Sequence, residues 1–276
     1  MTAEISEDAV LDGRLVLRQP RRGHRFGHDA VLLAAAVSAR GGDHAVDLGA
    51  GVGAAGLALA RRVEGLAVTL IDIDPELCRL ARENAARNGL VARVRAVCLD
   101  VAASAAAFAA AGLGPGTAAQ ILMNPPFNPA RQGIPSPDRR RRLARSAADE
   151  TLRMWVGAAA RLLRGQGTLT MICRADALDV VLAAFSAENL GGISLLPVYA
   201  KPGAPAIRVL ARAVKASRTP LSLLPGFLLA DETGKPTAQA EGVLRRGAML
   251  PLAGNRNGRA QPLGGSAGPA KAVPED

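Results

Sequence analysis

The feature that most constrains the fold is a regular alternation of short apolar runs with helical patterns between residues 45 and 213. The runs have the length of buried strands, and strands that alternate with helices form parallel sheets with helices on both faces. The sequence therefore predicts an α/β fold built on a doubly wound, mostly parallel sheet. The predicted strands are Ala45–Leu48, Ala67–Ile71, Val94–Leu99, Ile121–Met123, Thr168–Cys173, Ile193–Val198 and Arg208–Ala213.

Turn and cap residues mark the ends of two further elements. Asp74 and Pro75 are suited to the start of a helix after the second strand, and the Asn-Gly pair at 88–89 is suited to its left-handed stop. Before the sheet, residues 10–19 alternate in polarity around an Asp-Gly pair at 12–13. Such a pair favours a tight turn, so we expect a small β hairpin ahead of the sheet.

The length of 276 residues suits one large domain. Residues 253–276 are rich in Gly, Pro, Ala and Asn with almost no large apolar residue, so we expect a disordered tail there. The domain is then expected to comprise residues 1–252. Its predicted parts are a hairpin and helix at 9–40, a sheet core at 41–215 and a C-terminal extension at 216–252.

Composition narrows the partners and the compartment. Lys and Arg number 34 against 24 acidic residues, and the net charge of +10 favours a polyanionic partner such as nucleic acid. The N-terminus carries acids where a signal peptide needs basic residues, so we expect a cytoplasmic protein. The longest uncharged run, at 101–123, is mostly alanine and is interrupted by glycines, so no membrane span is predicted. The cysteines and histidines lack metal-ligand spacing, so no metal site is predicted.

The first chemical motif is the glycine-rich run VDLGAGVGAAG at residues 46–56, which follows the first predicted strand and leads into a helix. Gly49, Gly51 and Gly53 allow a sharp turn and the close approach of a ligand to main-chain N–H groups. Two cofactors compete for such a loop. The last three loop glycines match GxGxxG, and Asp72 lies about 20 residues further on, as in dinucleotide-binding enzymes.

Three acidic residues favour S-adenosylmethionine over a dinucleotide. Asp47 precedes the first glycine of the loop, and Asp72 and Asp100 end the second and third predicted strands. Ligands of open α/β sheets bind at these carboxyl ends of strands. Asp47 can contact the amino acid end of S-adenosylmethionine, Asp72 can accept from both ribose hydroxyls, and Asp100 can accept from the adenine amino group.

The second chemical motif is Asn124-Pro125-Pro126-Phe127, at the end of the fourth predicted strand. The prolines stiffen the turn and can hold the Asn124 side-chain oxygen and the Pro125 carbonyl at fixed positions. These two acceptors can bond both hydrogens of a planar amino or amide group, so that its nitrogen pyramidalises as it attacks a methyl sulfonium. Phe127 can stack on a flipped ring. The four residues are the catalytic candidates, and Asn124 is also a cofactor candidate.

With these motifs the sequence resembles class I methyltransferases that carry an (N/D)PP(F/Y/W) signature, and among them the bacterial valine-tRNA adenine-N6 methyltransferase family. The similarity covers residues 9–252 and includes the run RFGHDAVLLA at 25–34. The resemblance implies a Rossmann-like sheet of seven strands whose last strand is reversed. It implies methylation of adenine N6 in valine tRNA, next to the anticodon. The cofactor contacts that it implies are Asp47, Gly49, Gly51, Asp72 and Asp100, with Phe26 and Asp29 as further candidates.

An arginine run follows the NPPF motif and comprises Arg139, Arg140, Arg141 and Arg142, with Arg131 before it. A solvated charge run is one explanation, but the basic chain favours a rim that grips phosphates. We therefore expect tRNA as the partner of a monomeric protein. Trp155, which is the only tryptophan in the chain, is interpreted as a core residue.

The motifs leave other functions open. Guanine-N2 methylation in ribosomal RNA and glutamine-N5 methylation of a release factor would use the same NPP chemistry. An NAD-dependent oxidoreductase is the alternative from a different class, although the sequence offers no His, Tyr or Lys constellation for a hydride site. A non-catalytic RNA-binding module would need neither the three acids nor the NPPF motif.

Overall fold

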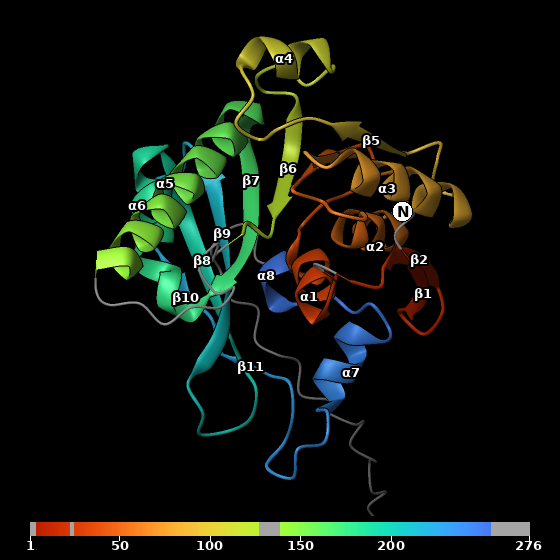
Figure 1. The fold of residues 1–276 in the computed structure, drawn as a ribbon. Coiled ribbons are helices and arrows are strands. Elements are labelled where there is room, and N and C mark those ends of the chain that lie inside the picture. Colours follow the sequence, from red (N-terminus) through yellow and green to blue (C-terminus); the bar gives the residue numbers. More distant parts are fainter. Residues whose placement is uncertain (1–3, 23–24, 127–138, 255–276) are drawn as a thin grey trace, which may run out of the picture.

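The computed structural model describes residues 4–22, 25–126 and 139–254, and for residues 139–147 only the backbone. One central sheet carries helices on both faces (Figure 1). Its strands are β3 (His44–Leu48), β4 (Ala67–Asp72), β5 (Val94–Cys98), β6 (Ala118–Met123), β7 (Leu163–Arg174), β8 (Leu190–Tyr199), β9 (Ala206–Lys215), β10 (Ser222–Leu223) and β11 (Phe227–Leu228).

The strand order across the sheet is β10-β8-β9-β7-β6-β3-β4-β5, and β11 also pairs with β8. The five strands from β3 to β7 are parallel to one another, whereas β9 is antiparallel to both of its neighbours. These observations confirm the prediction of a doubly wound, mostly parallel sheet whose seventh strand is reversed. All six residues of β6 are buried, as expected of a central strand with both faces covered.

The sheet is larger than the seven strands that the sequence predicts, because β10 and β11 extend its β8 edge. Both come from the region predicted as a C-terminal extension, 216–252. Each is only two residues long. A strand this short has no alternation of polarity that a sequence pattern can reveal.

The helices form two layers, one on each face of the sheet. In Figure 1, α1, α2 and α3 lie to the right of β6 and β7, and α5 and α6 lie to the left of these strands. Each layer packs on the sheet through its own apolar cluster. The helices are α1 (His28–Ala36), α2 (Ala54–Arg62), α3 (Pro75–Arg87), α4 (Ala105–Ala110), α5 (Arg139–Leu162), α6 (Leu178–Ala187), α7 (Ala238–Leu244) and α8 (Pro251–Gly254).

The predicted N-terminal hairpin is present, with β1 (Ile5–Val10) antiparallel to β2 (Leu15–Pro20). It begins at residue 5, before the predicted start at residue 9. The hairpin is held on α3 by two amides: Asn84 Oδ1 accepts from Arg18 N at 2.8 Å and Asn88 Oδ1 accepts from Val16 N at 2.9 Å. Asn84 is fully buried and also donates to Val52 O at 3.0 Å, so it links the hairpin to the glycine-rich loop.

The predicted limits of α3 are confirmed. Asp74 caps its N-terminus by accepting from the backbone N–H of Glu76 and of Leu77. Pro75 is its first residue, and Gly89 follows its end with a φ of +65°. These local signals were readable because each depends on neighbouring residues alone.

Helix α8 extends two residues beyond residue 252, the predicted end of the domain. Residues 253 and 254 belong to α8, and Ala253 is buried. The preceding residue, Leu252, is also buried, and its carbonyl accepts a hydrogen bond from Nη1 of the buried Arg212 at 2.9 Å. The rest of the predicted tail, 255–276, lies outside the described residues. In the part of the chain that the structure describes, no helix combines the length and the apolar character that crossing a membrane requires.

Candidate active site

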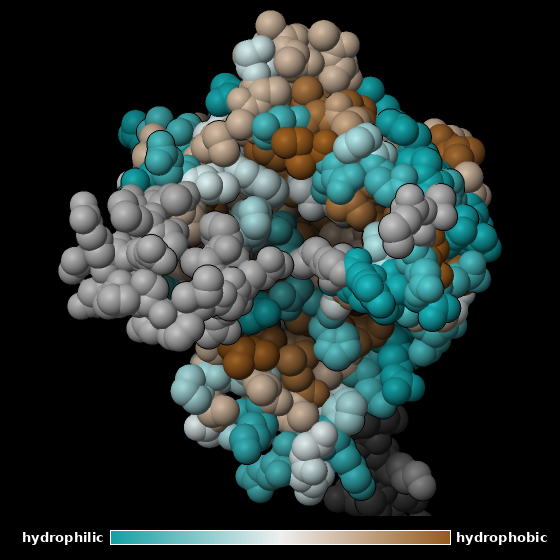
Figure 2. All heavy atoms as spheres, viewed as in Figure 1, coloured by the Kyte–Doolittle hydropathy of each residue, from teal (hydrophilic) through white to brown (hydrophobic). Residues whose placement is uncertain are grey.

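A cavity of about 200 Å³ opens at the carboxyl ends of β3 and β6, beside the start of α1. Figure 2 shows the molecule hollowed near its middle. Three segments that are distant in sequence meet here: the approach to α1, the loop between β3 and α2, and the end of β6. The lining residues are Arg25, Phe26, Gly27, Asp29, Ala30, Leu33, Asp47, Gly49, Ala50, Gly51, Val52, Ala54, Ala55, Leu77 and Asn124.

The loop glycines have different roles. Gly49, Gly51 and Gly53 all have positive φ angles, of +71°, +57° and +89°, which explains why this turn uses glycine. A Cβ atom at Gly53 would lie 2.8 Å from the Leu70 side chain, so Gly53 is needed for packing. A Cβ atom at Gly51 would meet none of the described atoms within 4 Å beyond its chain neighbours. Gly51 is therefore the loop glycine at which a ligand can approach the backbone.

Asp47 is almost fully buried, with 2% of its surface exposed, and its carboxylate lies at the cavity. Its Oδ2 accepts from the backbone N–H of Gly56 at 2.8 Å. Burial raises the pKa of Asp47 to about 7, the Gly56 N–H opposes this shift, and the charge of Asp72 adds to it. A buried carboxyl with one hydrogen-bond donor favours a cationic partner at this point of the cavity.

Asp72, at the end of β4, holds the glycine-rich loop in place. Its Oδ2 accepts from the backbone N–H of Gly51 at 2.7 Å, and its Oδ1 accepts from Asp74 N at 3.0 Å. Asp100 is exposed, and its carboxylate accepts from Ala102 N at 2.8 Å. Neither acid lines the cavity itself. Their predicted contacts with ribose and adenine therefore stay predictions, although Asp72 already fixes the loop at Gly51.

Phe26 and Asp29 both line the cavity. The backbone N–H of Phe26 donates to the side chain of Gln19 at 3.1 Å, so the hairpin positions this segment. Asp29 forms an ion pair with Arg208 of β9, with Nε 2.9 Å from Oδ2. Sequence reasoning missed Arg208, because 179 residues separate it from Asp29 and no motif surrounds it.

The NPPF motif reaches the cavity through its first residue. Met123 pairs with Leu48 in the sheet, so Asn124 follows β6 beside the start of the glycine-rich loop. Asn124 lines the cavity, Pro125 is buried and Pro126 is exposed. Phe127 and Arg131 lie outside the described residues. Arg139, Arg140, Arg141 and Arg142 form the first turn of α5, but their side chains also lie outside the description.

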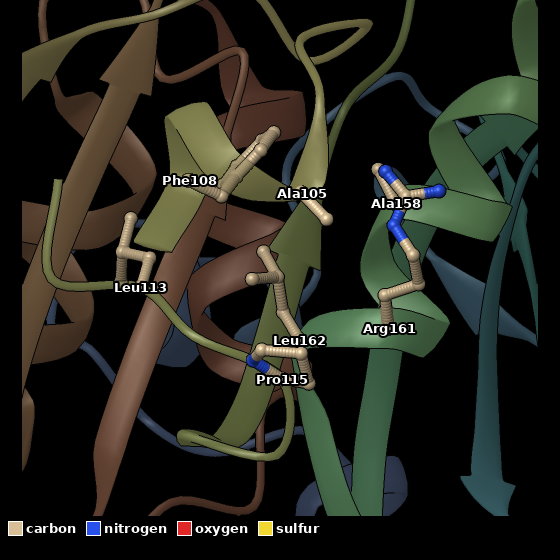
Figure 3. A pocket seen from close by; sticks show the side chains of 7 residues that line it. All are labelled: Ala105, Phe108, Leu113, Pro115, Ala158, Arg161 and Leu162. Atoms are coloured by element: carbon tan, nitrogen blue, oxygen red, sulfur yellow. The ribbon is translucent and has the colours of Figure 1, made fainter. Parts of the chain in front are cut away.

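A second cavity lies between α4 and the C-terminal end of α5 (Figure 3). It is lined mainly by apolar side chains, among them Phe108 and Leu162, and its volume is about 10 Å³. This is room for one water molecule at most, so it is a packing gap and no binding site. Among the described residues, no group of three or more His, Cys, Asp or Glu is placed to hold a metal ion.

Comparison with known proteins decides what kind of site this is. The model of the methyltransferase small domain family matches residues 25–179, which is more than half of the chain. The chain belongs to this family. The match contains the whole cavity lining, from Arg25 to Asn124.

Two curated relatives of this methyltransferase carry the same name, tRNA1(Val) (adenine(37)-N6)-methyltransferase. The protein from Bacteroides thetaiotaomicron is 30% identical over 187 residues, which cover 67% of this chain and 75% of the relative. The protein from Porphyromonas gingivalis strain W83 is 34% identical over 158 residues, which cover 56% of this chain and 60% of the relative.

Solved structures show the same fold. A predicted O-methyltransferase from Agrobacterium tumefaciens is 27% identical, with a TM-score of 0.68, and the match covers 80% of this chain and 98% of that one. A 16S rRNA N2 methyltransferase from T. thermophilus matches with a TM-score of 0.53 at 19% identity, over 77% of this chain and 50% of that one. The fold of this chain is therefore the class I methyltransferase fold.

The cofactor of this methyltransferase is S-adenosylmethionine, and the cavity fits it. Gly51 leaves open space where a ligand can approach the loop backbone. Asp47 presents a buried carboxyl to the cavity, which suits the α-ammonium group of the cofactor. Because the chain belongs to a methyltransferase family, the alternative in which the GxGxxG spacing binds a dinucleotide is wrong.

Proposed function

We propose that this methyltransferase modifies the exocyclic N6 amino group of adenine in tRNA, and that its substrate is valine tRNA next to the anticodon. The observation that carries the proposal is the position of Asn124, which lines the cavity beside the glycine-rich loop. An N-methyltransferase needs a hydrogen-bond acceptor at this point. The names of the curated relatives support adenine in tRNA as the acceptor.

The chain's own residues would act by positioning the amino group. The side-chain oxygen of Asn124 and the carbonyl of Pro125 would each accept one hydrogen of that group, so that the nitrogen pyramidalises and its lone pair is no longer delocalised into the ring. Phe127 would stack on the adenine. When bound, S-adenosylmethionine supplies an electrophilic methyl group. The amino nitrogen forms its new bond to the methyl carbon as the bond from that carbon to sulfur breaks and its electron pair stays on sulfur, and the nitrogen then releases one proton to water. Orientation of this kind supplies a large part of catalysis where no covalent nucleophile is needed.

The cofactor would be held mainly by the glycine-rich loop and by the acids at the ends of the neighbouring strands. Asp47 and the backbone at Gly49, Gly51 and Gly53 would contact its amino acid end. Asp72 would accept from the ribose hydroxyls, in addition to the Gly51 N–H that it binds already. The remaining cofactor candidates are Asp100 for adenine, with Phe26, Asp29 and Asn124 at the cavity wall.

The charge of the chain supports a polyanionic substrate. A net charge of +10 suits phosphate binding, and Arg131 with the run from Arg139 to Arg142 follows the NPPF motif closely enough to grip tRNA beside it. The cytoplasm, where tRNA is available, is the place of action that we infer, with the protein acting as a monomer.

The decisive experiment compares three possible substrates. Purified protein is incubated with labelled S-adenosylmethionine and with tRNA, ribosomal RNA or a release factor, and modified nucleosides are identified by mass spectrometry. We expect N6-methyladenosine in valine tRNA, and its loss from cells that lack the protein. N2-methylguanosine in ribosomal RNA, or methyl groups in the release factor alone, would overturn the tRNA proposal without affecting the assignment to the methyltransferase family.

A further inference from the structure

Trp155 lies against the first glycine of the loop. It is carried by α5, is partly buried, and packs on the apolar cluster of that face of the sheet. A Cβ atom placed on Gly49 would be 2.8 Å from Cζ3 of the Trp155 ring and would overlap its edge. The space beside Gly49 is therefore filled by this indole, whereas the space beside Gly51 is open.

Contacts from two elements, β4 and α5, hold the loop at three successive residues. The backbone N–H of Ala50 donates to Ile71 O of β4 at 2.8 Å, and the next N–H, that of Gly51, donates to Asp72 at 2.7 Å. Both hydrogen bonds are accepted by residues of β4. At Gly49 the contact comes from Trp155 of α5, which packs on the same apolar cluster as Ile71. The loop is therefore held by two hydrogen bonds to β4 and by the packing of the Trp155 ring against Gly49.

We propose that Trp155 is a positioning residue for the cofactor: its ring holds Gly49 in the conformation from which Ala50 and Gly51 hydrogen-bond to β4, and so keeps the loop in the shape that lines the cavity. The physical reason is the freedom of glycine, which loses more backbone entropy on ordering than any other residue. Without the ring, Gly49 can leave its left-handed conformation, and the bound state must order it again. The proposal rests on the cofactor of the family and is independent of which nucleotide is methylated.

The contact between Trp155 and Gly49 connects the helix that follows the NPPF motif with the loop that is predicted to bind the cofactor. Trp155 lies on α5, the helix that follows the NPPF motif in the chain, and it touches the loop that follows β3. Because Trp155 is the only tryptophan, its fluorescence reports this contact without any label. We expect S-adenosylmethionine to change the emission of the wild-type protein in a saturable way, with the midpoint that calorimetry gives for cofactor binding.

The test compares three variants by titration calorimetry with S-adenosylmethionine and by thermal unfolding. We expect Trp155→Ala to weaken the cofactor about tenfold, because ordering one residue's backbone has a cost of that order. Trp155→Phe, which keeps an aromatic ring beside Gly49, should stay within about threefold. Leu162→Ala is the matched control, because Leu162 is buried on the same helix but lines the small second cavity, away from the loop.

The pattern across these variants separates positioning from stability. Trp155→Ala and Leu162→Ala should both lower the melting temperature, whereas only Trp155→Ala should weaken the cofactor at a temperature where both are folded. Equal losses of affinity in the two variants would overturn the proposal, since stability alone would then explain them. Wild-type affinity in Trp155→Ala, or a flat fluorescence titration of the wild-type protein, would overturn it as well.

Discussion

The two sides of the cavity are built in different ways. On the donor side, which we define as the glycine-rich loop with Asp47 and Asp72, the contacts join residues close in sequence: 9 residues separate Asp47 from Gly56, and 21 separate Gly51 from Asp72. On the acceptor side, defined as Asn124 with Arg208 and Trp155, the contacts join distant segments. The Asp29–Arg208 pair spans 179 residues.

This difference has a consequence for function. A loop held mainly by residues near it in sequence depends little on the other elements beyond the contact of Trp155 with Gly49, so one type of donor side can serve many acceptors. The acceptor side depends on how α1, α5 and β9 pack, and small changes there can alter the substrate. Variants on the donor side should therefore change cofactor affinity, and variants on the acceptor side should change turnover or RNA binding, except at Trp155, whose ring contacts the donor loop at Gly49.

The largest effect is expected from Asn124→Ala on the acceptor side. Its amide would bind the amino group most strongly as the nitrogen pyramidalises, so turnover should fall by about 10² to 10³-fold while cofactor affinity changes little. Rapid-quench turnover measurements and calorimetry on the same protein check this. Phe127→Tyr serves as the control and should be tolerated, whereas Phe127→Ala should reduce turnover. Near wild-type turnover of Asn124→Ala would remove the NPPF motif from the active site.

The next effect is expected from Asp72→Ala on the donor side. The carboxylate accepts from Gly51 N and is predicted to bind the ribose, and each charge-assisted bond contributes about 1.5 to 3 kcal/mol. Cofactor affinity should therefore fall at least about tenfold, as measured by calorimetry.

The control for this prediction is Asp74→Ala, two residues along the chain. It removes the cap of α3 and should lower stability but leave cofactor affinity unchanged. If both variants bind S-adenosylmethionine equally well, Asp72 has no part in the ribose site.

The arginine run sharpens the comparison further, because it is predicted to bind the substrate and not the cofactor. If the four guanidiniums from Arg139 to Arg142 bind phosphates, their replacement by Gln should lower the slope of log affinity against log salt by roughly 3, at about 0.7 to 0.9 for each contact. Cofactor affinity should not change. tRNA binding at several salt concentrations measures the slope, and an identical slope in both proteins would mean that the run is a solvated face.

The smallest effect concerns the pH dependence of the donor side. The pKa of Asp47 is raised from 3.8 to about 7, chiefly by burial, so the folded protein holds this proton where the unfolded chain has released it. The stability of the cofactor-free protein should therefore decline as pH rises from about 4 to about 7.

Asp47→Asn isolates this contribution. The melting temperature of the variant relative to the wild-type protein should rise between about pH 4 and about pH 7, the window between the ordinary and the raised pKa of Asp47, and then level off. Differential scanning calorimetry without cofactor measures it. A difference that is the same at every pH would show that Asp47 has an ordinary pKa in the folded protein.

Local sequence determined the donor side of the site. The run from 46 to 56 predicted a strand, a glycine turn and a helix, and the structure contains β3, the turn and α2 at these positions. The cap at Asp74 and the hairpin before the sheet were also readable. Each of these features depends on interactions among near neighbours, which the order of residues specifies directly.

Only the tertiary structure decided the rest. It paired Asp29 with Arg208 and placed Trp155 over Gly49, and it added β10 and β11 to the sheet edge. These contacts join segments that are far apart in the chain, and nothing in the sequence around either partner identifies the other. The physical reason is that a side chain's neighbours across a packed core are set by how whole elements pack together, whereas its neighbours along the chain are set by covalent geometry.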